Sequence, residues 1–313
     1  MEKMSIVIPV YNEEKNIRPL TDQINKALQH SGIKYEIIFV DDGSEDHTVT
    51  EIKSIIARNI TLIELKRNFG QTAAIKAGID HADGDYIATL DGDMQNDPYD
   101  LLMMLDVLRQ KDCDIVTGIR ANRADDFILR KIPSYLANFM VRKVTRTNIK
   151  DNGCGIKVFR SDILKELSLY GERHRFMASL AVLDGATIEQ VEVKHHPRVH
   201  GKSKYGLGRT LKVISDLILM NFSRKYSQKP MYLFGTVGVI TSIAGAIILL
   251  YLLIQKIMGQ DIWGRPIMIL GVLLIFIGFQ IISTGLILDL VIRNEYESNR
   301  SKPYKIKRVK RAE

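Results

Sequence analysis

"DYIATLDGDMQNDP", residues 85 to 98, joins a short apolar run to a cluster of acids and amides. Asp91, Asp93 and Gln95 alternate there, so an extended segment would project all three side chains to one side. Oxygen atoms gathered in this way are the ligands that a hard cation such as Mg²⁺ or Mn²⁺ prefers. Asp and Asn are also common in turns, because their side chains bond the nearby backbone. Taken alone, the stretch leaves a cation site and an ordinary turn both open.

The N-terminal two thirds of the chain alternate between strand-like and helix-like segments. Apolar, β-branched runs predict strands at 5–11, 35–42, 60–66, 85–91 and 113–119. Helical segments are predicted near 13–30, 46–57, 71–82 and 98–110. Such alternation predicts an α/β fold, Rossmann-like, with a mostly parallel sheet and helices on both faces. Polar clusters follow each of the first four strands, and ligands of open sheets bind at that edge.

The C-terminal third contains two long apolar segments. No charged residue occurs from Pro230 to Gln255 or from Pro266 to Leu288, and each stretch reaches the roughly 20 residues that a helix needs to cross a bilayer. Buried core helices are the alternative, but they are rarely so long and so uniformly apolar. We therefore expect a two-helix transmembrane hairpin, with spans at about 231–255 and 266–288.

Basic residues indicate the orientation of this hairpin. The chain has a net charge of +8 over 313 residues, with eight Lys or Arg in 195–230 and eight in 293–313. These basic segments flank the apolar spans, where anionic lipid headgroups lie, so a membrane surface is favoured over nucleic acid. The link between the spans carries only Lys256 and Arg265. The positive-inside rule therefore predicts a multi-pass protein of the plasma membrane with both termini in the cytoplasm.

Several motifs in order resemble glycosyltransferase family 2, the inverting enzymes of GT-A fold. They are "SIVIPVYNEEKNI", "VDDGSEDHT", "LKRNFGQTAAIKAGIDHADGDYIATLDGDMQNDP" and "DIVTGIR". The match covers roughly residues 4 to 205. The trailing spans resemble the polyprenyl-phosphate glycosyltransferases, which include dolichol-phosphate mannose synthases and bacterial undecaprenyl-phosphate glucosyltransferases. No Q-x-x-R-W motif follows residue 160, so a processive polysaccharide synthase is disfavoured.

The resemblance implies four segments and one reaction. The segments are a catalytic domain (1–205), a basic juxtamembrane helix (206–229), the two spans (230–290) and a basic tail (291–313). The reaction moves a hexose-type sugar from a UDP- or GDP-sugar to a polyprenyl phosphate, with undecaprenyl phosphate preferred, for cell-envelope glycosylation. The family also suggests a homo-oligomer, such as a tetramer. A membrane-anchored protein that binds nucleotide sugars without turnover, and recruits a partner enzyme, is the alternative.

The resemblance also assigns residues to the donor side of the site. Residues that line the nucleotide sugar are expected to be Pro9, Tyr11, Asn12, Glu13, Asp41, Asp42, Arg67 and Asp91. A divalent cation, Mg²⁺ or Mn²⁺, is expected on Asp91, Asp93 and Gln95. Such a cation offsets the negative charge that develops on the leaving diphosphate, which favours the cation site over the plain turn.

On the acceptor side, the resemblance assigns the lipid phosphate to four basic residues, Arg120, Arg198, Lys202 and Lys204. Arg suits phosphate because its fork donates two parallel hydrogen bonds, although a solvated basic loop would explain residues 198–204 as well. The segment 127–144 is amphipathic and would lie either in the bilayer interface or on the sheet.

Asp151 and Asp93 are the predicted catalytic residues. In "DNGCGIKVFR", Gly155 stands where the glucosyltransferase branch has an Asp, and Lys157 replaces an Arg. The general base is therefore in doubt, and Asp151 is a positioning group that shares a base role, or a plain turn residue. A phosphate monoester is largely dianionic at neutral pH, with a second pKa of ~6, so it has little need of a base.

Glycines recur every seven residues in both spans. They are Gly238 and Gly245 in the first span and Gly271, Gly278 and Gly285 in the second. At this spacing they fall along one side of each helix, where small residues allow close helix packing in lipid. The stripes would join either the two spans of one chain or the spans of neighbouring protomers.

Overall fold

The computed structural model describes residues 2–56, 59–120, 149–169, 171, 173–197 and 230–299. The chain forms two compact units, Met1–Ile218 and Leu219–Glu313, and each is described by itself. The amphipathic segment 127–144, the basic segment 206–229 and the end of the tail, 300–313, lie outside the described residues.

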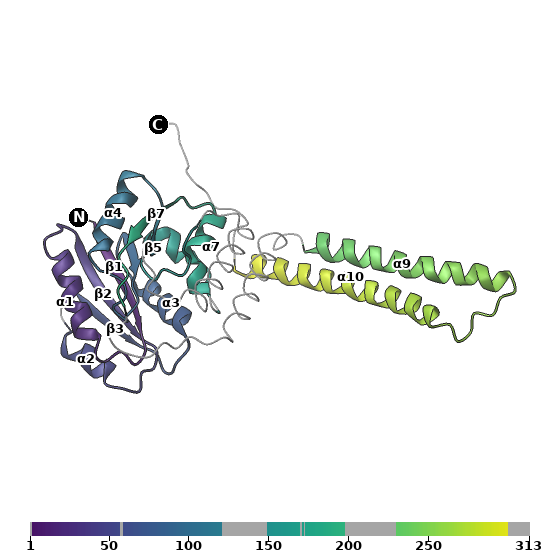
Figure 1. Ribbon diagram of the computed structural model, residues 1–313, viewed down its shortest axis with the longest axis horizontal. Helices are drawn as coiled ribbons and strands as arrows, with labels where there is room; N and C mark the ends of the chain where they lie inside the picture. Colours follow the sequence, from purple (N-terminus) through teal and green to yellow (C-terminus); the bar gives the residue numbers. More distant parts are fainter. Residues whose placement is uncertain are drawn as a thin grey trace. The chain divides into compact units, whose positions relative to one another are not determined.

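A seven-stranded sheet forms the centre of the N-terminal unit, in the order β3-β2-β1-β4-β6-β5-β7 (Figure 1). Its strands are β1 (Lys3–Val10), β2 (Lys34–Asp41), β3 (Ile60–Glu64), β4 (Tyr86–Thr89), β5 (Ile115–Arg120), β6 (Lys157–Arg160) and β7 (Ile188–Val193). All neighbouring strands pair in parallel, except that β6 runs antiparallel to β4 and β5. The predicted α/β fold with a mostly parallel sheet is confirmed, and the antiparallel strand β6 was not anticipated.

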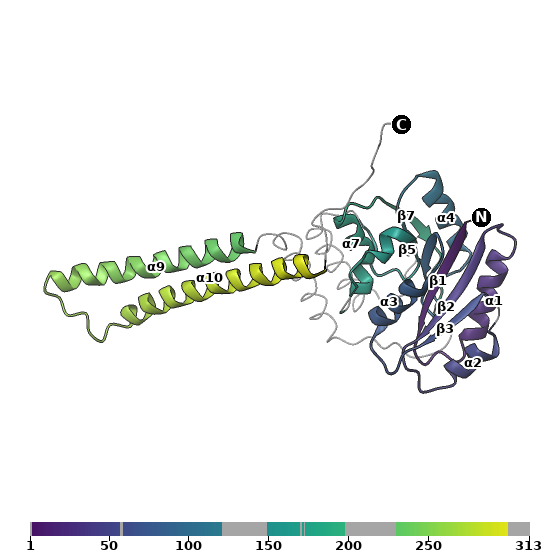
Figure 2. The ribbon, with the colours of Figure 1, turned by 180° about the vertical axis from the view of Figure 1, so that it is seen from behind.

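Helices cover both faces of this sheet. The longer ones are α1 (Ile17–Leu28), α3 (Gln71–His81) and α4 (Asp100–Gln110), and the shorter ones are α2 (Thr48–Ser54), α6 (Ser161–Lys165), the 3₁₀ helix η2 (Arg173–Phe176) and α7 (Met177–Leu183). The views from opposite sides place α1 and α2 on one face and α3 and α7 on the other (Figures 1 and 2). Strand β1 therefore buries both sides: Ile6 and Ile8 pack with the α1 face, and Val7 packs with α3. Burial on both faces explains its continuous apolar run.

The carboxyl ends of the first four strands meet along one edge. Val10 pairs with Asp41, and Asp41 pairs with Glu64, so the ends of β1, β2 and β3 are level in the sheet. Strand β4 lies on the other side of β1 and ends at Thr89. The loops that follow these strands carry most of the predicted site residues, and the topology brings them to one place.

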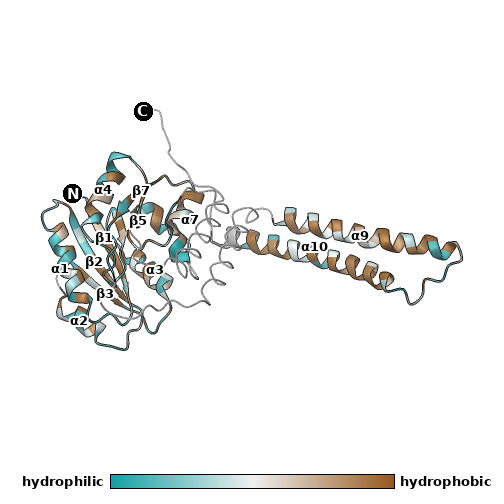
Figure 3. Ribbon diagram, in the orientation of Figure 1, coloured by the Kyte–Doolittle hydropathy of each residue, from teal (hydrophilic) through white to brown (hydrophobic). Residues whose placement is uncertain are grey.

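Two long helices form the C-terminal unit, α9 (Met231–Ile257) and α10 (Pro266–Asn299). Within residues 231–257 and 266–292, an 18-residue stretch reaches a mean hydropathy of 2.6 and 2.5, respectively, and both helices are long enough to cross a membrane. Figure 3 shows apolar residues along most of both helices. The two apolar helices that the sequence predicts are therefore present.

The glycine stripes face each other between α9 and α10. A Cβ added to Gly238 would lie 2.7 Å from the carbonyl oxygen of Gly278, and one added to Gly245 would lie 2.6 Å from that of Gly271. No side chain larger than hydrogen fits at these positions without a shift of the helices. The stripes thus join the two helices of one chain, and the oligomeric state stays a prediction.

Candidate active site

Hydrogen bonds tie the loops after β1 and β2 together. The backbone of Asn12 is left-handed (φ 55°), a conformation that Asn tolerates better than most residues. Its N–H donates to Ser44 Oγ at 2.9 Å, and its Oδ1 accepts from the N–H of Glu45 at 2.8 Å. The N–H of Glu13 donates to Thr48 Oγ1 at 2.8 Å. Two predicted nucleotide residues, Asn12 and Glu13, therefore fix the relative position of the two loops.

The adjacent acids Asp41 and Asp42 are both buried but differ in their bonding. Asp42 accepts the N–H groups of Phe69 at 2.7 Å and Gly70 at 2.9 Å, so it holds the loop after β3. Burial raises the pKa of Asp42, and the charge of Asp41 adds to this against the two hydrogen bonds. Asp41 Oδ2 accepts two turn N–H groups at 3.1 Å, but its buried Oδ1 has no partner among the described residues. Of the two, Asp41 is the acid whose carboxylate keeps one oxygen without a partner among the described residues.

Arg67 and Phe69 lie on the third loop. The guanidinium carbon of Arg67 lies 4.6 Å from the centre of the Phe69 ring, and Phe69 is 52% exposed. The loop approaches Gly43 so closely that a Cβ there would lie 2.6 Å from the carbonyl carbon of Arg67. Pro9 is in β1 beside Val40, so it too lies at this edge.

The acids of the opening stretch lie on a turn. Strand β4 ends at Thr89, before Asp91, and Met94 is left-handed with φ 59°. The expectation that an extended segment aligns Asp91, Asp93 and Gln95 is therefore wrong, because the chain turns between them. Asp91 Oδ1 accepts from Gln71 Nε2 at 3.0 Å, and the buried Asp93 accepts from the N–H of Gln95 at 3.2 Å.

Gly155 packs directly against the side chain of Asp91. A Cβ at residue 155 would lie 2.0 Å from Asp91 Oδ2 and 2.6 Å from its Cγ. The backbone of Gly155 is also fixed from β4, because Thr89 Oγ1 donates to its carbonyl at 2.9 Å. Any side chain at residue 155, including the Asp of the glucosyltransferase branch, would therefore collide with Asp91, and glycine avoids this contact.

The donor set fits a hard divalent cation. Asp91 and Asp93 carry carboxylate oxygens and Gln95 carries an amide oxygen, and all of these are hard donor atoms. Within the ranges that the structure describes, no group of three or more His, Cys, Asp or Glu is placed to hold a metal. The protein thus offers a small oxygen set, which is typical of Mg²⁺-type sites completed by substrate phosphates and water.

Arg120 and Asp151, predicted for the acceptor phosphate and for catalysis, bind each other. Arg120 Nε donates to Asp151 Oδ2 at 2.7 Å, and its Nη2 donates to Oδ1 at 2.8 Å. Burial alone lowers the pKa of Arg120, but the bonds to Asp151 outweigh it and raise the pKa above its ordinary value. The Asp151 side chain is only 6% exposed. A carboxylate in such a two-pronged pair has its charge largely compensated.

Lys157 is a buried amine below these acids, and sequence reasoning gave it no role. It lies in β6 between Thr89 and Thr117, is 3% exposed, and donates from Nζ to the carbonyl of Cys154. Burial lowers its pKa, while the carboxylates of Asp91 and Asp151 oppose that effect. The lysine within the apolar run "IKVF" could have indicated this role, because a lysine is rarely buried unless its charge is paired.

Two further buried pairs support the same region. His174 Nδ1 lies 2.7 Å from Thr72 Oγ1, at the start of α3, and Ser179 Oγ donates to Asn152 Oδ1 at 2.7 Å. These pairs connect η2 and α7 to the segments that carry Gln71 and Asp151. The 3₁₀ helix and α7 thus help to fix the positions of the segments that carry Gln71 and Asp151.

The turn that carries Asp91, Asp93 and Gln95 also contacts the start of the predicted acceptor segment. The N–H of His196 donates to the carbonyl of Gln95 at 2.8 Å, and Asn96 pairs with His195 in an isolated bridge. Arg198, Lys202 and Lys204 follow directly but lie outside the described residues.

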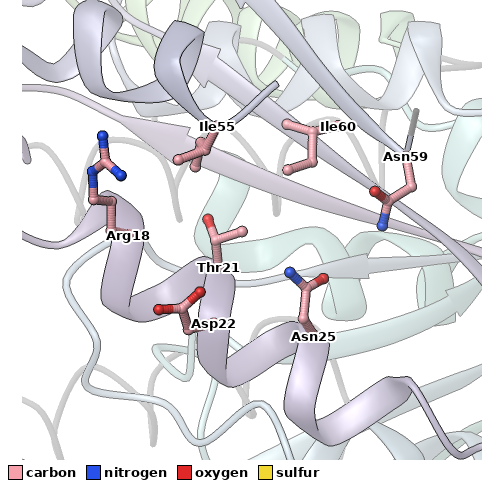
Figure 4. Close-up of a pocket in the computed structure, with 7 residues that line it drawn as sticks. All are labelled: Arg18, Thr21, Asp22, Asn25, Ile55, Asn59 and Ile60. Atoms are coloured by element: carbon pink, nitrogen blue, oxygen red, sulfur yellow. The ribbon is translucent and has the colours of Figure 1, made fainter. Parts of the chain in front are cut away.

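A pocket elsewhere in this unit is drawn in Figure 4. It is lined by residues of α1, including Arg18 and Asn25, and by residues around the α2–β3 connection, including Ile55 and Ile60. None of its lining residues belongs to the candidate site.

The sequence matches one protein family and is similar to relatives along almost its whole length. A model of the family described as Glycosyl transferase family 2 matches residues 5–168. The dodecaprenyl-phosphate galacturonate synthase of Rhizobium johnstonii is 39% identical, over 98% of this chain and 93% of its own length. The undecaprenyl-phosphate 4-deoxy-4-formamido-L-arabinose transferase of Proteus mirabilis is 32% identical, over 99% and 94%.

Solved structures share the fold at low identity. Glucosyl-3-phosphoglycerate synthase from Mycobacterium tuberculosis, in complex with Mn²⁺, UDP and glucosyl-3-phosphoglycerate, has a TM-score of 0.55 and 17% identity over 71% of this chain and 80% of its own. A mannosyltransferase from Pyrobaculum calidifontis, in complex with GDP-Man and Mn²⁺, has a TM-score of 0.52 and 18% identity over 71% and 64%.

Proposed function

The chain belongs to glycosyl transferase family 2, and from this premise we propose that it transfers a hexose-type sugar from a nucleotide-diphosphate sugar to a polyprenyl phosphate. The observation that carries the proposal is similarity along almost the whole chain, spans included, to two enzymes whose names both specify a polyprenyl phosphate. Those enzymes transfer different sugars, so the likeness supports the acceptor more strongly than the sugar. Undecaprenyl phosphate is the acceptor that we propose.

The donor site lies at the edge where β1 to β4 end. The unpartnered Oδ1 of Asp41 accepts a hydrogen bond from the nucleoside, and Arg67 and Phe69 flank it on the next loop. Asp91, Asp93 and Gln95 hold Mg²⁺ or Mn²⁺, which when bound offsets the charge on the leaving diphosphate. Both structural neighbours described above contain Mn²⁺, which supports a divalent cation in this fold. The nucleotide is UDP or GDP.

The acceptor phosphate supplies its own nucleophile. One phosphate oxygen attacks the anomeric carbon while the bond from that carbon to the nucleotide diphosphate breaks, with inversion of configuration. The phosphate is already largely dianionic at neutral pH, so no proton has to leave the attacking oxygen. Asp151 then serves to hold Arg120 toward the phosphate, because its carboxylate is committed to the guanidinium. Arg198, Lys202 and Lys204 complete the acceptor site.

The apolar helices α9 and α10 are long and apolar enough to cross a membrane, which supports a membrane protein. We propose that the catalytic unit (1–205), the segment 206–229, both termini and the basic tail face the cytoplasm, where nucleotide sugars are made. Homo-oligomers, such as tetramers, are part of the proposal.

The test uses the purified full chain in lipid nanodiscs, radiolabelled UDP- and GDP-sugars, and undecaprenyl phosphate. The expected result is a lipid-extractable labelled product that requires Mg²⁺ or Mn²⁺ and disappears in excess EDTA. Nucleotide-sugar binding with no lipid-linked product for any sugar or metal would instead favour the non-catalytic recruiting protein. Transfer that persists in EDTA would overturn the cation assignment.

A further inference from the structure

An amide side chain lies exposed in the middle of the second apolar helix. Gln280 is the fifteenth of the 27 residues in the span Pro266–Ile292, which places it about 20 Å along the helix from either end. Its side chain is exposed and makes no hydrogen bond to any described residue. If α10 crosses the bilayer as proposed above, this amide is at the depth of the hydrocarbon core, where polar groups need a partner.

Gln280 faces away from the contact between the two helices. Gly278 and Gly285 are buried against α9. At 3.6 residues per turn, Gln280 lies about 200° from Gly278 and about 140° from Gly285 around the helix. The hairpin therefore does not satisfy this amide itself. Thr284, whose hydroxyl lies on the same side of the helix, already donates to the backbone carbonyl of Gln280 at 2.9 Å.

We propose that the outer face of α10 around Gln280 is a contact between two copies of this chain, with the two Gln280 amides hydrogen-bonded to each other. A primary amide carries both donors and an acceptor, so the same residue of a second copy satisfies both in a symmetric contact. The surroundings of Gln280 on this face are apolar, including Ile277 and Ile287. They exclude water, and a polar group in such a site strengthens association of helices in lipid.

Cysteine cross-linking tests the contact directly. The chain has two cysteines, Cys113 and Cys154, and both are buried in the N-terminal unit, so Gln280→Cys adds the sole exposed thiol. Phe279→Cys is the matched control, since Phe279 is 65% exposed at the same depth but about 100° away. In liposomes with a mild oxidant, Gln280→Cys is expected to form a disulfide-linked dimer, and Phe279→Cys to form at most a third as much. Equal cross-linking at both positions, or none at residue 280, overturns the proposal.

A second measurement does not depend on a disulfide. Gln280→Leu keeps a similar volume but removes the amide, and self-association measured by energy transfer on dilution in liposomes is expected to weaken about three- to tenfold. The Phe279→Leu variant is expected to associate as the unmutated chain does. An unchanged Gln280→Leu association, or a monomeric unmutated chain, overturns the contact. Transfer of sugar to lipid is measured in parallel, so that failure of this contact and failure of the proposed reaction are seen separately.

Discussion

Replacing Gly155 by alanine tests whether the position of Asp91 controls turnover. Gly155 does not have the left-handed backbone that would strain an alanine, so the added methyl group acts through its contacts alone. That Cβ would lie 2.0 Å from Asp91 Oδ2, whereas ordinary contacts begin at 3.4 Å. The carboxylate must therefore move by about 1.4 Å or turn away, and its 3.0 Å bond from Gln71 is lost with it.

A misplacement of about 1 Å at a reacting site costs roughly 10²-fold in rate, which corresponds to about 2.7 kcal/mol in the barrier. We expect Gly155→Ala to lower kcat by about that factor. The concentration of Mn²⁺ for half-maximal rate should rise as well, because Asp91 is a proposed ligand. The assay is the initial rate of transfer to undecaprenyl phosphate, with thermal unfolding followed by circular dichroism to verify the fold.

Gly171→Ala is the matched control. Its φ of 61° costs an alanine about 1–2 kcal/mol in backbone strain, but no atom lies within 4 Å of the added group. This variant should lose a little thermal stability and keep its turnover. A folded Gly155→Ala enzyme that retains kcat within about threefold of the unmutated enzyme would show that the position of Asp91 against Gly155 has no part in catalysis.

Three other predictions concern single side chains. Asp93→Asn should remain folded and lose nearly all metal-dependent transfer, as measured over a Mn²⁺ titration; full activity would exclude Asp93 as a ligand. Lys157→Met should lower kcat about tenfold while thermal stability is unchanged or higher, because a buried charge is costly to fold; a loss of stability with normal kcat would make Lys157 purely structural. Burial, with the charges of Arg175 and Lys157, lowers the pKa of His174 from 6.5 to about 3. The unfolded chain therefore binds more protons below pH 6.5, so the stability due to neutral His174 is complete above that pH and falls by about 2.7 kcal/mol by pH 4.5. His174→Gln should flatten the decrease in melting temperature between pH 7 and pH 4.5, and an unflattened curve would contradict this.

The strands and their polar ends were predictable because they are local features. Each of the first five strands has a run of apolar, β-branched residues, and the parallel topology then brings the polar ends together. Strand β6 has only four residues and contains Lys157, so neither length nor pattern reveals it. The strand is defined by its tertiary pairing, because it lies between β4 and β5 and pairs with both in the antiparallel direction.

The contacts within the site depend on tertiary structure, and there the sequence was less informative. Arg120 and Asp151 are 31 residues apart, and their assignment to separate roles did not reveal that they form a pair. Likewise, the sequence shows that Gly155 departs from the family pattern but does not show its contact with Asp91. That contact depends on the turn after β4, where the alternation of Asp91, Asp93 and Gln95 predicts an extended segment instead. Residue types can be read from a motif, whereas the partner of each charge depends on how distant loops meet.

The roles of Asp91, Asp93 and Asp151 in the proposed site support a reaction without a protein base. In the proposed site Asp91 and Asp93 are ligands of the cation, and Asp151 accepts two hydrogen bonds from Arg120. An acid at residue 155, as in the glucosyltransferase branch, would collide with Asp91, so this chain cannot add one there unless Asp91, the proposed cation ligand, moves. A dianionic phosphate acceptor removes the need for such a base, whereas a sugar hydroxyl, which must lose a proton, would not. The proposed site is therefore better suited to a phosphate than to a sugar hydroxyl as the attacking group.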